Sequence, residues 1–216
     1  MKKGITLILL ICSTYFAIAQ QESEFQIRAG LGWAIYGARS EVILKTPSGD
    51  VSSSNKDGAA TLHLPLEIRY GFNEDINVGL DFKFGSYVYD PDSSEGKSNR
   101  FVVIGIAGEY SIVAKEHLRW YVGLGINGSS LVLEENDKTK NTKEIWTYSG
   151  GGFRLNTGLL IFLSDHVGLN FNLGYDGHNF KLKEYELNGQ KLDLTNLEGT
   201  LKVGGVDGTL GLFVRF

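Results

Sequence analysis

Ten charged residues lie in segments whose alternate positions are apolar, and they are the first candidates for chemistry in this sequence. Side chains that alternate along an extended chain face two different media, so these charges share the row opposite the apolar one. If that row faces a common interior, opposite charges must pair, because an unpaired buried charge is costly. The charges then either plug the interior or line a path for ions. The ten residues are Arg28, Glu67, Arg69, Asp81, Lys83, Glu109, Arg119, Arg154, Asp207 and Arg215.

The four histidines are the other candidates, since imidazole is the usual general acid or base near neutral pH. His63 falls in the charged row, whereas His178 falls in a long polar segment. His117 and His166 fall in tight polar turns, where solvent surrounds them. Cys12 lies in the N-terminal apolar segment, so the rest of the chain offers no thiolate for a metal. We therefore expect no catalytic residue, no metal site and no cofactor.

Eight alternating segments carry these residues, and each has the length of a strand. A tilted strand needs about 9–11 residues to cross a bilayer, and no helical period of 3.6 residues appears after the N-terminal segment. The pattern predicts an all-β fold, an eight-stranded antiparallel up-and-down transmembrane β-barrel in which the first strand pairs with the last. The segments are Phe25–Ile35, Leu62–Phe72, Ile76–Phe84, Val102–Ile112, Leu118–Asn127, Phe153–Ile161, Val167–Tyr175 and Leu201–Phe216.

The connections between the segments alternate strictly between short and long. Such alternation fits an even number of strands with both chain ends on one side, and barrels of the outer membrane place short turns in the periplasm and long loops outside. We expect four long polar loops at the exterior. The short turns are Asn73–Asp75, Lys115–His117 and Ser164–His166, and the long loops are Gly37–Gly58, Asp90–Asn99, Leu133–Thr147 and Gly177–Gly199.

The direction of the apolar row separates two classes of barrel. A membrane barrel turns this row toward lipid, with aromatic residues such as Trp33, Trp120 and Tyr110 near the two interfaces. The opposite row is rich in glycine, as the crowded interior of an eight-stranded barrel requires. A soluble carrier of the lipocalin type would instead turn the apolar row inward around a ligand. The glycine content favours the membrane barrel.

The N-terminal residues Met1–Ala19 read as a secretory signal peptide, with Lys2 and Lys3 before an apolar stretch and Ala17–Ala19 as the cleavage site. The apolar stretch is too short for a transmembrane helix, which needs about 20 residues. Without the two lysines, 19 basic residues stand against 25 acidic ones, a net charge of −6. This charge excludes a nucleic-acid partner, which would require a basic face. The barrel domain is expected to span residues 20–216.

The last strand alternates Leu210, Leu212, Val214 and Phe216 with smaller or polar residues, and the sequence stops on the aromatic residue. Together with the eight segments and the loop alternation, this strand resembles the small outer-membrane β-barrel family, of the type of the OmpA transmembrane domain and OmpX. The resemblance covers Phe25–Phe216. It implies a location in the cell outer membrane, contact with outer-membrane lipid and lipopolysaccharide, and assembly by the barrel-assembly machinery, which reads the terminal strand.

We expect a structural or surface-interaction role, through adhesion or binding of an extracellular ligand by the four long loops. The interior is expected to be closed by paired charges, because eight strands leave little bore. Ile145–Tyr148 are aromatic and β-branched, and a strand edge there could bind a partner by strand addition. The alternative from another class is an outer-membrane enzyme that modifies lipid A. No spacing of histidine, serine and acidic residue matches the families that do so.

Overall fold

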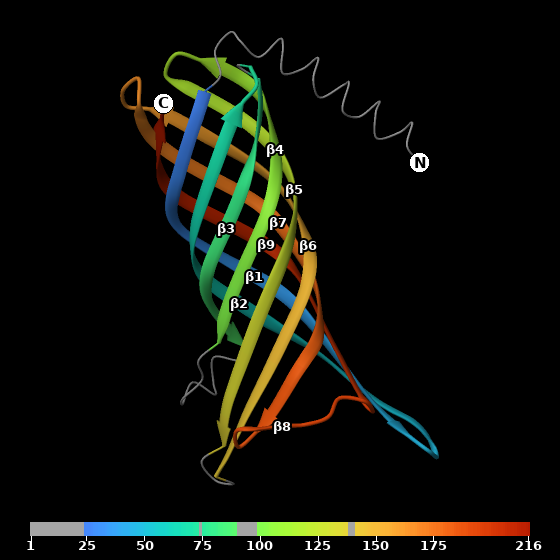
Figure 1. Cartoon of the computed structure of the whole chain (residues 1–216). Coiled ribbons are helices and arrows are strands. Elements are labelled where there is room, and N and C mark those ends of the chain that lie inside the picture. Colours follow the sequence, from blue (N-terminus) through green and yellow to red (C-terminus); the bar gives the residue numbers. More distant parts are fainter. Residues whose placement is uncertain (1–23, 74, 90–98, 138–140) are drawn as a thin grey trace, which may run out of the picture.

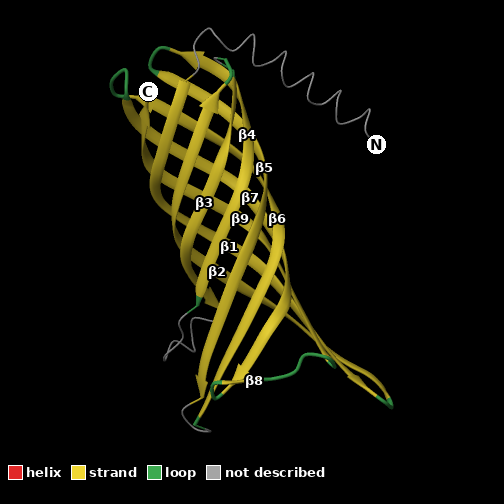
Figure 2. Cartoon of the chain, in the orientation of Figure 1, coloured by secondary structure: helices red, strands yellow, loops and turns green. Residues whose placement is uncertain are grey.

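The computed structural model describes residues 24–73, 75–89, 99–137 and 141–216. The predicted signal peptide, residues 1–19, lies outside the described residues, as do Glu74 and nearly all of the predicted loop Asp90–Asn99. Within the described ranges the chain is made of strands and connections (Figure 2). No helix in these ranges is long and apolar enough to cross a membrane.

Eight long antiparallel strands form one closed barrel, which confirms the predicted architecture (Figure 1). Neighbours in sequence pair in order from β1 to β7, and β9 pairs with both β7 and β1 to close the ring. The two-residue β8 pairs only with the end of β7, among the described residues. The strands are β1 (Glu24–Thr46), β2 (Gly49–Gly71), β3 (Ile76–Tyr89), β4 (Arg100–Lys115), β5 (Leu118–Asp137), β6 (Thr142–Phe162), β7 (Val167–Leu187), β8 (Gln190–Lys191) and β9 (Leu197–Arg215).

Closure between the first and last strands extends over nearly their whole length. The register runs from Gln26 opposite Arg215 to Leu44 opposite Leu197. At the end that carries the short turns, Phe216 exchanges backbone hydrogen bonds with Phe25 in both directions, at 3.3 and 2.8 Å. A closed ring leaves no free sheet edge in this part of the barrel, so every strand there has two hydrogen-bonded neighbours.

From the short turns to the level of Ile35, the apolar row faces out and the charged row faces in. Leu31 and Ile35 expose 62% and 64% of their surface, whereas Arg28 and Arg69 expose 1% each. The membrane arrangement predicted from the glycine row is therefore confirmed, and a barrel with this row turned inward around a ligand is excluded. A belt of apolar side chains surrounds the barrel here, which suits the interior of a bilayer.

Glycine in the inward row allows neighbouring strands and large inward side chains to come close. At Gly30 a Cβ would stand 2.3 Å from the carbonyl oxygen of Leu210 and 2.7 Å from the Cα of Gly211. Both of these atoms are backbone, so a side chain could be accommodated only by moving β9. The glycines that the sequence places opposite the apolar row thus set how tightly the barrel is coiled.

Three of the four predicted long loops prove to be mostly strand, which corrects the sequence prediction. β1 and β2 stay paired out to Thr46 and Gly49, so that Gly37–Gly58 is a hairpin rather than a loop. Its turn ends on Gly49, whose φ of 127° suits only glycine. The polar sequence misled the prediction because a hairpin surrounded by water needs no apolar row; pairing satisfies its backbone.

The same correction holds for the other two loops. β5 and β6 pair out to Asp137 and Thr142, across most of the predicted loop Leu133–Thr147. β7 continues to Leu187 inside the predicted loop Gly177–Gly199. These extensions project beyond the barrel on the side away from the short turns (Figure 1).

The two rows exchange character where the strands leave the apolar belt. Further out, the side chains that face inward are apolar and those that face outward are polar, as in β7, where Phe180 is buried and Lys181 exposed. The inward apolar residues form one cluster between the charges and the outer hairpins, packed against Leu133, Trp146 and Leu182. Its buried members are Ala34, Tyr36, Ala38, Ala59, Tyr87, Phe101, Val103, Leu131, Tyr148, Phe180, Leu201 and Val203.

Candidate functional site

The part of the barrel surrounded by the apolar belt holds a buried network of charges in its interior. Glu109 lies at the end of this network nearest the short turns. Its Oε2 accepts from Arg28 Nη2 at 2.9 Å and its Oε1 from Arg69 Nε at 2.8 Å. Arg69 also pairs with Asp81 at 2.5 Å, and Arg28 reaches Glu67 at 3.5 Å. β1, β2, β3 and β4 supply these side chains, so the network links four adjacent strands across the interior.

Arg154 on β6 crosses the interior and connects the two halves of the network. Its Nη1 donates to Glu67 Oε1 at 3.1 Å, and its Nη2 donates to the Asn172 side-chain oxygen at 3.0 Å. The same guanidinium lies 3.5 Å from carboxylate oxygens of Asp81 and of Asp207. A guanidinium has five donors in a fixed plane, which allows one residue to serve several carboxylates.

Lys83 forms the part of the network nearest the outer hairpins. Its Nζ lies 2.5 Å from Asp176 and 3.0 Å from Asp207. His63 Nε2 lies 3.2 Å from the same Asp207 carboxylate, which exposes 0% of its surface. His63 is thus a buried partner of the charge network and has no access to the outer rim, where a surface substrate would meet it.

Eight of the ten charges named from the sequence meet in this network. Arg119 and Arg215 do not; they lie at the end that carries the short turns. There Arg119 pairs with Glu24 at 3.2 Å, Arg215 stands 3.7 Å from the same carboxylate, and both guanidinium groups lie over the ring of Phe162. This second, smaller cluster lies at that end of the interior.

Sequence reasoning did not identify Asp176 and Glu24 as interior charges, and it placed His178 in a loop rather than in a strand. The alternation that ends at Tyr175 in the prediction continues, so that Asp176 and His178 both face inward on β7. His178 therefore lies in a strand and is 4% exposed, not in a solvated loop. The inward row that contains Asn172 and Gly174 continues at every second residue to Asp176 and His178, so the same alternation could have identified both.

His178 is surrounded by aromatic rings of the apolar cluster. Its ring stacks on Phe180 at 5.7 Å between centroids and meets Phe101 and Tyr36 edge to face at 5.5 and 6.3 Å. Phe101 and Phe180 expose 1% and 0% of their surface. Side chains that line a water-filled channel would be exposed to that water, so the interior is closed at this level as well as at the charges.

The projecting hairpins hold ion pairs and a stacked aromatic pair. Lys45 on β1 bonds Glu198 on β9, and the rings of Trp146 and Tyr185 stack at 4.0 Å. Lys143 lies 2.6 Å from Glu134, and this hydrogen bond holds the pKa of Glu134 below its usual range. The charge of Glu134 and its pairing with Lys143 are therefore lost at a lower pH than the charge of an ordinary glutamate.

In the described part of the chain, no group of three His, Cys, Asp or Glu side chains could hold a metal ion.

A closed antiparallel ring with an apolar belt, charges inside and long hairpins at one end defines an integral membrane β-barrel. The model of the outer membrane protein beta-barrel domain matches residues 5–204, and the chain belongs to this family. Its location is the outer membrane, as the resemblance implied. No curated protein sequence matches the chain.

Among solved structures, the first of the following supports the fold. The outer membrane protein OprG from Pseudomonas aeruginosa aligns at 15% identity with a TM-score of 0.61, over 90% of this chain and 96% of that one. Neisserial surface protein A aligns at 12% identity and a TM-score of 0.42, over 81% and 95%. Ail, the attachment invasion locus protein of Yersinia pestis, aligns at 15% identity and a TM-score of 0.41, over 91% and 100%.

Proposed function

We propose that this outer-membrane barrel does not conduct and acts through its outer hairpins, by structural and binding contacts at the cell surface. The observation that carries the proposal is the closure of the interior at two levels. Arg28 and Asp207 in the charge network and Phe180 in the apolar cluster expose 1%, 0% and 0% of their surface. A barrel closed in this way can offer chemistry only on its outside.

The β1–β2 hairpin is the surface best suited to bind a partner. The register between β2 and β3 begins at Ala59, and no other described strand pairs with Gly49–Lys56 on the side away from β1. All eight residues are exposed. An unpaired edge can accept a strand from another chain. Ile145–Tyr148, the stretch expected to offer such an edge, is paired with β5 on one side and β7 on the other.

A lipid A-modifying enzyme finds little support in the histidines. His63 and His178 are buried at 2% and 4% exposure inside the barrel, out of reach of a lipid headgroup. His117 and His166 belong to the end with the short turns, which faces the periplasm in outer-membrane barrels. We therefore propose a non-enzymatic role.

Two measurements test the proposal. In planar lipid bilayers the purified protein is expected to give no steady channels; regular, large conductance steps would contradict the closed interior. For the binding role, the β1–β2 hairpin is shortened at the register pair of Glu41 and Ser54 by an Asn-Gly turn. The matched control shortens the β5–β6 hairpin at the pair of Glu135 and Glu144.

The readout is adhesion of expressing cells to each other and to immobilised extracellular-matrix proteins. Loss of adhesion with the first shortened hairpin and retention with the second is the expected result. If both shortened proteins and cells without the protein adhere equally, the binding role is wrong.

A further inference from the structure

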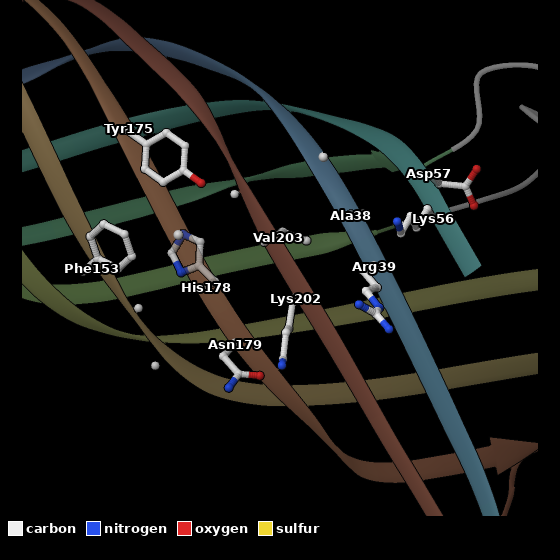
Figure 3. A pocket seen from close by; sticks show the side chains of 15 residues that line it. Ala38, Arg39, Lys56, Asp57, Phe153, Tyr175, His178, Asn179, Lys202 and Val203 are labelled. Atoms are coloured by element: carbon white, nitrogen blue, oxygen red, sulfur yellow. The ribbon is translucent and has the colours of Figure 1, made fainter. Parts of the chain in front are cut away.

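A groove crosses the outer wall of the barrel where the apolar belt ends on the side of the hairpins. Gly37, Gly204 and Gly177 stand next to one another in its floor, on β1, β9 and β7. A Cβ at Gly37 would find no atom nearer than 3.9 Å. The groove has a volume of about 750 Å³ (Figure 3).

Aromatic rings bound the groove toward the apolar belt. Phe153 and Tyr175 lie with their centroids 6.0 Å apart and expose 49% and 46% of their surface. A Cβ at Gly177 would stand 2.8 Å from the ring of Phe153, and one at Gly204 would stand 2.4 Å from the hydroxyl of Tyr175. The rings therefore cover Gly177 and Gly204 and leave Gly37 open, and aromatic side chains at this level mark the membrane interface.

Basic side chains bound the other side of the groove. Arg39 pairs in register with Lys56 on β2 and with Lys202 on β9, which places three cations on three neighbouring strands. Figure 3 shows them at the end of the groove opposite Tyr175 and Phe153. Among the described carboxylates, none forms an ion pair with any of these three residues. Asp57, next to Lys56 on β2, also lines the groove, and Glu41 follows two positions further out than Arg39 on β1.

The opposite wall of the barrel differs at the same level. Gly128 on β5 pairs with Gly151 on β6, but the next outward residues beyond them are Ser130 and Ser149. The row of Arg39 thus carries cations on β2, β1 and β9 and none on β5 and β6, and the next row outward adds Lys181 on β7. A general requirement of the membrane interface would not produce this asymmetry.

We propose that this groove binds a phosphorylated lipid of the outer leaflet, with the phosphate on the basic row and an acyl chain across Gly37. Arginine and lysine next to the membrane attract anionic headgroups, and arginine can hold a phosphate through two parallel hydrogen bonds. The basic row lies at the outer end of the apolar belt, which is the level of the headgroups. Gly37 lies on β1 between Arg39 of the basic row and Ile35 of the belt, and its outward side is open, so a chain attached to the phosphate can pass over it beside the rings.

The test is native mass spectrometry of the detergent-solubilised protein with dimyristoylphosphatidylglycerol, dimyristoylphosphatidylcholine or diphosphoryl lipid A as probes. The expected result is retention of the two anionic lipids and loss of the zwitterionic one. The triple variant Arg39→Gln, Lys56→Gln, Lys202→Gln should bind the anionic probes on the order of tenfold to a hundredfold more weakly. The matched control, Lys45→Gln, Lys143→Gln, Lys191→Gln, removes the same charge from the hairpins and should bind as the parent.

Equal binding by the two triple variants, or equal retention of phosphatidylcholine, would overturn the proposal. Soluble glycerol phosphate should not compete with the lipid; competition would mean a site for free phosphate and would also overturn it. Gly37→Val keeps every charge and fills the floor, so it should weaken lipid binding about fivefold while the barrel stays folded on an unboiled gel. Unchanged lipid binding in the folded Gly37→Val protein would exclude the acyl chain from the groove.

Discussion

Glu109 holds together the part of the internal charge network nearest the short turns. One carboxylate serves Arg28 and Arg69 at 2.9 and 2.8 Å, with 1% of its side chain exposed. Removing a single member of such a pair leaves a charge buried with fewer partners, which typically costs about 3–5 kcal/mol, whereas replacing both members by apolar residues can be nearly neutral. The network is therefore vulnerable to single changes more than to paired ones.

We expect Glu109→Met to lower the free energy of unfolding by about 3 kcal/mol or more. The double variant Glu109→Met, Arg28→Met should lose less than the sum of its single variants, since each removes the other's uncompensated charge. Urea unfolding in lipid vesicles, followed by tryptophan fluorescence, measures both. As a control, Lys191→Met acts on an exposed pair with Glu184 and should leave the free energy of unfolding unchanged within error. Additive losses in the double variant would contradict the coupling.

At the scale of the strand, period-two alternation predicted which residues face the interior but not where each strand ends. Within the apolar belt one row is apolar and the other is charged or small. The strands, the row that faces lipid and the residues of the interior, including eight of the ten charges, could therefore be inferred. Beyond Ile35 the rows exchange character, and the alternation of Tyr36 and Ala38 against Arg39 no longer looks like a membrane strand. The apolar cluster was missed for this reason, because its residues follow the rule of a water-soluble barrel.

The inward glycines provide a test at the same scale. Gly30→Val would place side-chain atoms against the backbone of β9, so we expect the barrel to fail to close. Gly108→Val is the matched control, because it faces outward on β4, where the nearest atom to a Cβ is the carbonyl oxygen of Asn77 at 3.9 Å. The measurement is the fraction of protein that migrates as a folded band on an unboiled gel. A folded Gly30→Val protein would show that β9 yields more easily than the contacts indicate.

For the whole molecule, closure of the ring makes the barrel a single cooperative unit. Every strand in the belt has two neighbours, so no strand can leave without breaking two ladders. The terminal strand takes part in this closure through Phe216 and Phe25. Whether Leu210, Leu212, Val214 and Phe216 also serve as the signal for the assembly machinery stays a prediction, as does the cleaved signal peptide.

We expect the protein from the outer-membrane fraction to migrate differently on a denaturing gel when boiled and when unboiled. A closed ladder resists the detergent at room temperature and opens on heating. Phe216→Ser should reduce the folded band in cells, because it removes both the ring contact with Phe25, at 6.2 Å between centroids, and the terminal aromatic residue. Identical migration of boiled and unboiled samples would contradict a stable closed barrel.

The exchange of character between the two rows has a mechanical consequence. A hairpin that holds a partner outside the cell transmits load to the barrel along β1 and β2. An outward pull would draw Leu31 and Ile35 from lipid into water, and an inward push would drive Arg39 and Lys56 toward hydrocarbon, at a cost of about 2–4 kcal/mol for each charge that reaches the midplane. The barrel is thus held at one depth against force from either side, whatever the length of the hairpins above it.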